Sequence, residues 1–136
     1  MNDAVIYLHS SAIIKLIFDE DESDALRHFL AAHPVRVSSA LARIEVLRTA
    51  GRVRDPIVMR DAQALLTGLR LLRPDETLLA AAVDVPPPAL RPFDAIHLVT
   101  ALSLRPSVVG IVVYDHALAD AAKAASLTVF APGVAH

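Results

Sequence analysis

Three carboxylates and one histidine stand at the edges of apolar segments in this sequence, and these residue types in such positions can do chemistry. Asp94 begins a strongly apolar helical segment, and Glu45 lies in the first turns of another. Asp115 and His9 each follow an apolar run of strand length. Carboxylate oxygens that converge from separate elements bind Mg²⁺ or Mn²⁺, and such ions activate water for attack on a phosphodiester. We therefore expect a metal-dependent phosphodiesterase site, in which His9 is the residue that does not fit.

Each of these residues also has an ordinary explanation when it is taken alone. Asp115 has the position of a helix N-cap, and Asp94 would interact favourably with the dipole of its helix. Glu45 would form a surface ion pair with Arg48, three residues further on. His97, one turn after Asp94, is better explained as a buried histidine that satisfies a hydrogen bond than as a base. The site is therefore predicted from the combination of acids and not from any single one.

The composition limits what kind of protein this is. At 136 residues, of which 54% are hydrophobic, the chain has the size of one domain with its own core, and we expect a single domain over residues 1–136. The absence of cysteine excludes disulfides and thiolate metal sites, and it fits a cytoplasmic location. No apolar run reaches the roughly 18 residues of a membrane span. The start, Asn2-Asp3, is not basic and does not resemble a secretory signal.

The arginines are concentrated in one stretch of the chain. The net charge is −2, which argues against a protein that coats nucleic acid through its overall potential. Five arginines nevertheless fall close together: Arg43, Arg48, Arg52, Arg54 and Arg60. Together they would hold phosphates by releasing counterions, although a solvated helix flank explains any single one of them equally well.

Apolar runs and their flanking residues predict five strands and seven helices. The strands cover residues 4–8, 35–37, 69–72, 110–114 and 128–130. The helices cover about 10–18, 19–30, 41–54, 56–66, 76–82, 93–104 and 115–125. Ser10 or Ser11 is expected to cap the first helix, and Ser38 or Ser39 the third. The segment Pro86 to Pro88 predicts an extended, polyproline-type connection.

This alternation of strands and helices predicts an α/β fold. Strands that are joined through helices form a parallel sheet covered on both faces, and the site of such a fold lies at the carboxyl ends of the strands. His9 directly follows the first predicted strand, and Asp115 directly follows the fourth. Both side chains should therefore project from the same edge of the sheet.

Four parts of the sequence resemble a known family. They are residues 7–16, residues 39–46 around Glu45, residues 91–98 around Asp94, and the pair Tyr114-Asp115. In order and spacing, over essentially the whole chain, they are similar to the PIN-domain ribonucleases, and most of all to the VapC toxins of bacterial toxin–antitoxin pairs. The resemblance implies a three-layer α/β/α PIN-like fold with a central, mainly parallel sheet. It also implies a homodimer, Mg²⁺- or Mn²⁺-dependent cleavage of RNA, and inhibition by a VapB-type antitoxin.

The resemblance also assigns roles to single residues. It implies that Glu45, Asp94 and Asp115 are catalytic and hold the metal together with His9, and that Ser10 is the hydroxyl beside the first metal position. The family has Asp where this sequence has His9, and an imidazole supplies neither the charge nor the oxygen that Mg²⁺ prefers. We therefore expect weakened metal binding and activity. Our hypothesis is that His9 is protonated among the acids and partly replaces the missing cation.

Two other interpretations are open at this point. The first is a catalytically inactive PIN-fold protein that still dimerises and binds an antitoxin. The second is a phosphoacceptor receiver domain, which needs a lysine at the end of a late strand, whereas Lys15 and Lys123 fall in predicted helices. For the antitoxin, the resemblance implies an apolar helix that lies across residues 19–30 and extends a basic side chain to the acids.

Overall fold

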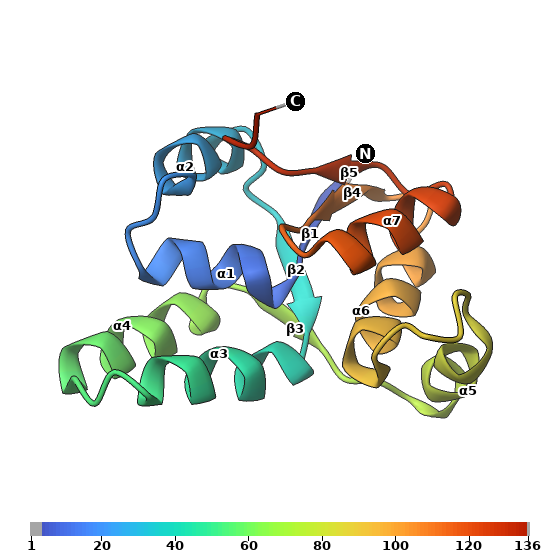
Figure 1. Ribbon diagram of the computed structural model, residues 1–136, viewed down its shortest axis with the longest axis horizontal. Helices are drawn as coiled ribbons and strands as arrows, with labels where there is room; N and C mark the ends of the chain where they lie inside the picture. Colours follow the sequence, from blue (N-terminus) through green and yellow to red (C-terminus); the bar gives the residue numbers. More distant parts are fainter. Residues whose placement is uncertain (1–3, 136) are drawn as a thin grey trace.

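A five-stranded sheet between two layers of helices forms the fold (Figure 1). The computed structural model describes residues 4–135. The expectation about a secretory signal concerns Asn2 and Asp3, which lie outside these residues. Within residues 4–135, every helix is too short or too polar to cross a lipid bilayer.

The elements alternate along the chain as the sequence predicts. The strands are β1 (Val5–Leu8), β2 (Arg36–Ser39), β3 (Arg70–Leu72), β4 (Val108–Val112) and β5 (Val129–Phe130). The helices are α1 (Ser10–Ile17), α2 (Ser23–Ala31), α3 (Leu41–Gly51), α4 (Pro56–Thr67), α5 (Glu76–Asp84), α6 (Pro92–Ser103) and α7 (His116–Ala124).

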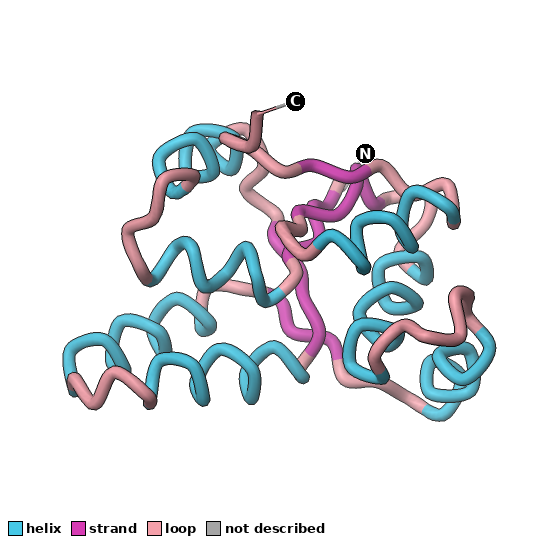
Figure 2. The backbone as a smooth tube through the Cα atoms, viewed as in Figure 1, coloured by secondary structure: helices cyan, strands magenta, loops and turns pink. Residues whose placement is uncertain are grey.

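All strand pairs in the sheet are parallel, and the strand order is β3-β2-β1-β4-β5. The first strand of the chain therefore lies in the middle, between β2 and β4, and every residue of β1 is buried. Figure 2 shows the strands running between the two groups of helices. This arrangement confirms the predicted α/β/α fold with a central parallel sheet.

The two faces of the sheet are covered by different helices. Side chains alternate along β1, so Ile6 and Leu8 pack against α1, α2, α3 and α4, whereas Val5 and Tyr7 pack on the side of α6 and α7. In Figure 1 these two layers lie to the left and to the right of the sheet, with α5 beside α6. Helices of both layers begin at the carboxyl edge of the sheet, because α1 follows β1, α3 follows β2 and α7 follows β4.

Three local expectations were wrong, each for a physical reason. The acidic residues 19–21 precede α2 instead of opening it, because the buried Ser23 hydroxyl donates to the Lys15 carbonyl at 2.7 Å and accepts from the Glu20 N–H at 2.9 Å, which closes a turn before the helix. The segment 86–88 is not extended, since the Leu90 N–H donates to the Pro87 carbonyl at 3.0 Å and the chain turns back from α5 to α6.

The third concerns the helix caps. The N-cap of α1 is His9, not Ser10 or Ser11. The N-cap of α3 is Ala40, which has no capping side chain, although Ser39 Oγ still accepts from the Leu41 N–H at 3.2 Å.

Candidate active site

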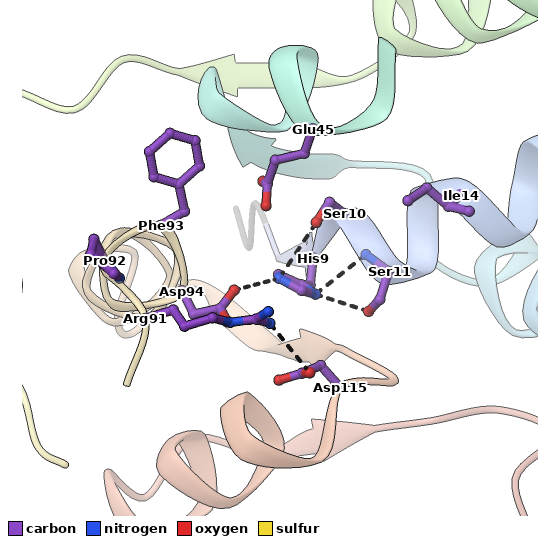
Figure 3. Close-up of a pocket in the computed structure, with 10 residues that line it drawn as sticks. All are labelled: His9, Ser10, Ser11, Ile14, Glu45, Arg91, Pro92, Phe93, Asp94 and Asp115. Atoms are coloured by element: carbon purple, nitrogen blue, oxygen red, sulfur yellow. Dashed lines mark hydrogen bonds and ion pairs between the residues drawn. The ribbon is translucent and has the colours of Figure 1, made fainter. Parts of the chain in front are cut away.

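A pocket of about 530 Å³ opens at the carboxyl ends of β1 and β4 (Figure 3). Its lining includes all five residues that the sequence singled out, which come from the β1–α1 junction, α3, α6 and the β4–α7 junction: His9, Ser10, Glu45, Asp94 and Asp115. The remaining lining residues are Ser11, Ile14, Arg91, Pro92 and Phe93. The fold thus gathers acids from separate elements into one cavity.

His9 is held from both sides of its ring. The Ser11 backbone N–H donates to His9 Nδ1 at 3.3 Å, and Ser11 Oγ lies 2.9 Å from the same nitrogen. On the other side, His9 Nε2 lies 3.0 Å from Asp94 Oδ1. Because a backbone N–H can only donate, Nδ1 is an acceptor, and the ring hydrogen is on Nε2, where it points at the carboxylate. This pattern favours a neutral His9 over the protonated ring of our hypothesis.

Asp94 is buried in the first turn of α6, and both of its carboxylate oxygens are engaged. His9 contacts Oδ1, and Arg91 donates to Oδ2 from Nε at 3.1 Å and from Nη2 at 3.0 Å. Burial alone would raise the pKa of Asp94, but the hydrogen bonds from His9 and Arg91 outweigh it and hold this pKa below its ordinary value. The positive charge beside Asp94 is therefore supplied by Arg91.

Asp115 fits both explanations that the sequence offered for it. Its Oδ2 accepts the Leu118 N–H at 2.9 Å, which makes Asp115 the N-cap of α7. Its Oδ1 lies 3.5 Å from Arg91 Nη2 on the pocket side. The Arg91 guanidinium therefore joins the carboxylates of Asp94 and Asp115, as Figure 3 shows.

Glu45 reaches the pocket from α3, and its partner is a histidine rather than Arg48. Its Oε1 lies 2.7 Å from His97 Nε2, and the other ring nitrogen of His97 lies 2.8 Å from the Tyr7 hydroxyl. The His97 ring has no exposed surface. The interpretation of His97 as a buried histidine that satisfies a hydrogen bond is confirmed, but its partners are distant in the sequence.

Ser10 and Ser11 differ in what they contact. Ser10 Oγ lies at the pocket wall, 3.5 Å from His9 Nε2. Ser11 Oγ accepts the Tyr114 N–H at 2.9 Å and so ties the start of α1 to the end of β4. Ser11 was expected only as a possible cap of the first helix, and no sequence pattern indicates its contact with Tyr114.

Arg91 was also missed, although a signal for it was present. It stands three residues before Asp94 at the start of a helix, and side chains three apart on a helix are neighbours. An arginine at that spacing from a predicted metal ligand is a candidate partner for the ligand.

The donor set of the pocket fits a divalent cation. Oxygen and nitrogen atoms of His9, Glu45 and His97 lie within 4.8 Å of one another. Both nitrogens of His97 are hydrogen-bonded, as are both nitrogens of His9, so either ring must give up a partner to bind an ion. The lining of the pocket as a whole offers three carboxylates, from Glu45, Asp94 and Asp115, and the His9 imidazole. A set that includes nitrogen suits Mn²⁺ better than Mg²⁺ because Mg²⁺ is bound almost exclusively by oxygen.

Comparisons with known proteins agree with this picture. The PIN domain family matches residues 6–125. Ribonuclease VapC46 of Mycobacterium tuberculosis is 45% identical over 129 residues, which cover 95% of this chain and 98% of the relative. Ribonuclease VapC35 of the same species is 40% identical over 136 residues, covering 96% and 99%, and Ribonuclease VapC47 is 32% identical over 133 residues, covering 95% and 98%.

Solved structures show the same fold at low identity. M. tuberculosis VapC20, described as a sarcin-ricin loop cleaving toxin, superposes with a TM-score of 0.71 at 16% identity and covers 90% of this chain and 96% of its own. A toxin–antitoxin complex from Klebsiella pneumoniae superposes with a TM-score of 0.65 at 16% identity, covering 82% and 87%.

The parallel sheet, its two helical layers and the acidic pocket at the strand ends define an α/β/α protein of the PIN type. The chain belongs to the PIN-domain family, and it is similar over nearly its whole length to VapC ribonucleases. The resemblance stated from the sequence is thereby confirmed. The receiver-domain interpretation was wrong, and Lys15 and Lys123 do lie in helices, α1 and α7.

Proposed function

We propose that this chain is an endoribonuclease toxin of the VapC type, the toxic partner of a type II toxin–antitoxin pair, built as one PIN domain over residues 1–136. Relatives named VapC ribonucleases, at up to 45% identity over most of the chain, support this function. The single observation that carries it is the convergence of Glu45, Asp94 and Asp115 on one pocket. The reaction is hydrolysis of an RNA phosphodiester bond.

In this proposal Glu45, Asp94 and Asp115 hold Mg²⁺ or Mn²⁺, and His9 is a weaker fourth ligand. When bound, such an ion polarises a phosphoryl oxygen and lowers the pKa of water. The protein orients the carboxylates beforehand, since Asp115 is fixed by its cap on α7 and Asp94 is buried in the first turn of α6. Ser10 presents a hydroxyl at the pocket wall, where it can donate to a phosphate oxygen.

Two features around the pocket suit a single-stranded RNA. Arg48 on α3 and Arg52 at its C-cap are exposed, and they follow Glu45 by three and seven residues. At about 100° per residue they share the helix face of Glu45 and lead away from the pocket, where they can contact phosphates. Phe93 lies at the pocket and is 41% exposed, so its ring is available for stacking on an unpaired base.

A second candidate function is an inactive PIN-fold protein that only binds an antitoxin. The VapC relatives do not favour it, but one contact pattern is compatible with it: both oxygens of Asp94 are taken, by His9 and by Arg91, so the pocket is electrostatically satisfied by its own side chains. An ion must displace these contacts to bind. Because His9 donates through Nε2 and accepts through Nδ1, it also has no free lone pair in this arrangement.

The remaining parts of the proposal concern partners and place of action. A VapB-type antitoxin would lay an apolar helix across residues 19–30 and direct a basic side chain to the acids. The toxin would act in the cytoplasm as a homodimer. A basic side chain from an antitoxin would take the position between Asp94 and Asp115 that Arg91 takes here.

The experiment that tests the function is a cleavage assay with a fluorescent single-stranded RNA. Wild type, His9→Asp and Asp94→Asn are incubated with Mg²⁺, with Mn²⁺ and with EDTA. We expect metal-dependent cleavage by the wild type, stronger cleavage by His9→Asp and none by Asp94→Asn. Cleavage that persists in EDTA, or that Asp94→Asn leaves intact, contradicts the metal-dependent site. Cleavage by His9→Asp alone identifies the wild type as the inactive antitoxin-binding form.

A further inference from the structure

Behind the pocket, three side chains form a line of hydrogen bonds from β1 through α6 to α3. The Tyr7 hydroxyl lies 2.8 Å from His97 Nδ1, and His97 Nε2 lies 2.7 Å from Glu45 Oε1. Tyr7 and His97 have no exposed surface. The line joins three elements that position site residues, since β1 leads into His9, α6 carries Asp94 and α3 carries Glu45.

Each hydrogen bond in this line has a defined direction. The carboxylate of Glu45 only accepts, so His97 Nε2 carries the hydrogen and donates it. Burial raises the pKa of Tyr7 far above its ordinary value, so its hydroxyl keeps its proton and donates to Nδ1. His97 is thereby held as one tautomer. Turning the ring would leave buried polar atoms without partners, which is unfavourable in a low-dielectric interior.

This line fixes one oxygen of Glu45 and leaves the other open. The Glu45 side chain is 24% exposed and extends from α3 into the pocket, as Figure 3 shows. Oε1 is bound by His97, and among residues 4–135 no hydrogen-bond donor contacts Oε2. A glutamate side chain has three rotatable bonds, so without a partner it would occupy many rotamers. The bond from His97 selects the rotamer that directs Oε2 into the cavity.

We propose that His97, oriented by Tyr7, is a positioning residue that holds Glu45 in the conformation in which it binds the cation of the pocket. This inference rests on the proposed function, because it assigns a purpose to Glu45 in that site. Neither Tyr7 nor His97 touches the substrate or the cation. Partners of this kind behind a metal ligand set its orientation, and their loss lowers metal affinity by about 10- to 100-fold.

Three variants separate positioning from mere packing. Tyr7→Phe keeps the ring in the core and removes only the donor to His97 Nδ1. His97→Gln keeps an N–H near the place of Nε2, whereas His97→Ala removes it. Tyr114→Phe is the matched control, because Tyr114 is the only other tyrosine and its hydroxyl donates to the Pro132 carbonyl at 2.8 Å, away from the pocket lining.

Two measurements are made on each folded variant: the ¹³C NMR signal of the Glu45 carboxylate, and the affinity for Mn²⁺ by titration calorimetry. We expect Tyr7→Phe and His97→Ala to shift or broaden the Glu45 signal, and Tyr114→Phe to leave it unchanged. Mn²⁺ affinity should fall by about 10- to 100-fold in His97→Ala, by less in Tyr7→Phe, and should recover largely in His97→Gln.

The outcome that overturns the proposal is a Glu45 signal in Tyr7→Phe that matches the wild type. Equal losses of Mn²⁺ affinity in His97→Gln and His97→Ala would do the same, because the N–H would then be irrelevant. Should the wild type bind no Mn²⁺, the metal-dependent function is wrong, and the Glu45 signal alone decides whether His97 positions the carboxylate.

Discussion

Arg91 donates two hydrogen bonds to a single carboxylate oxygen of Asp94, at 3.1 Å and 3.0 Å. The same guanidinium lies 3.5 Å from Asp115, so a cation tethered to the chain stands between two of the proposed metal ligands. Its side chain is largely exposed, while that of Asp94 is almost fully buried. Arg91 is therefore free to leave, and Asp94 is not.

Arg91→Gln should bind Mn²⁺ more tightly than the wild type. Removing the guanidinium frees Asp94 Oδ2 and ends the competition between two cations, and an exposed ion pair of this kind is worth about 1 kcal/mol, or roughly fivefold in affinity. Titration calorimetry measures the change. Arg60→Gln, which removes an arginine paired with Asp61 on α4, is the control and should have no effect. Weaker Mn²⁺ binding by Arg91→Gln would mean that Arg91 supports the site instead of competing for it.

His9→Asp should raise Mg²⁺ affinity and RNA cleavage by at least about tenfold, because it adds a charged oxygen ligand where a nitrogen now stands. Without metal the same variant should be less stable than the wild type, since two carboxylates would then face each other at the position of the His9–Asp94 contact. Calorimetry with Mg²⁺ and thermal unfolding in EDTA measure both effects. Unchanged Mg²⁺ affinity would defeat the idea that His9 weakens the site.

Asp94 should make stability depend on pH in acid solution. Its pKa in the folded protein is lowered, so its contribution is complete above about pH 4, the pKa of an unfolded aspartate, and is lost as the pH falls through the folded pKa. In EDTA, Asp94→Asn should lower the free energy of unfolding by about 1–3 kcal/mol near neutral pH, as expected for lost hydrogen bonds to a charged group. Urea unfolding measures this difference.

The difference between wild type and Asp94→Asn should shrink as the solution is made more acidic. Asp84→Asn, at the exposed end of α5, serves as the control and should have the same stability as the wild type throughout. A gap for Asp94→Asn that stays constant down to strongly acidic pH would show that the charge of Asp94 contributes nothing through its contacts with His9 and Arg91.

Arg52→Gln should weaken RNA binding and reduce its dependence on salt. If Arg52 contacts one phosphate of a single strand, the slope of log affinity against log salt falls by about 0.7. Arg43→Gln is a matched control on the same helix, because Arg43 stands two residues before Glu45 and faces the opposite side of α3. Fluorescence anisotropy at several salt concentrations measures both. Equal slopes for the two variants would place the RNA elsewhere.

Phe93→Leu should weaken binding of single-stranded RNA by about 1–3 kcal/mol, the range for loss of one aromatic–base stack. Phe93→Tyr keeps an aromatic ring and should bind as the wild type does. Both are compared on an RNA with an abasic position and on the intact strand. If the intact strand loses no more affinity than the abasic one, Phe93 does not stack on a base.

Most of the fold could be predicted from the sequence because its signals are local. Apolar runs such as residues 4–8 and periodic segments such as α6 each carry their own pattern, and the alternation of strand and helix then dictates a parallel sheet. Two of the errors fell where a side chain bonds to the backbone in a way that the apolar pattern does not indicate. Ser23 shortens α2 in this way, and His9 takes over the cap of α1.

The location of the site could be predicted from the sequence, but the hydrogen bonds and ion pairs among its residues could not. His9 and Asp115 follow adjacent parallel strands, so their meeting at one edge follows from topology. The bond between His97 and Glu45 depends on the rotation of two helices and on the depth of a buried ring, and nothing in the order of residues encodes it. Arg91 could be predicted in part. Its spacing from Asp94 in the sequence indicates their contact, but nothing in the sequence indicates its second contact, with Asp115.

The central position of β1 has a consequence for when the protein can act. The strand made first is sandwiched between β2 and β4, and β4 is contributed by a late part of the chain. A growing polypeptide that does not yet include β4 lacks one of the two neighbours of β1. It also lacks Asp115, the last carboxylate of the pocket, which follows β4. The pocket can therefore form only after β4 and Asp115 have been added to the chain, so the central strand β1 waits for residues about a hundred positions later before its site is complete.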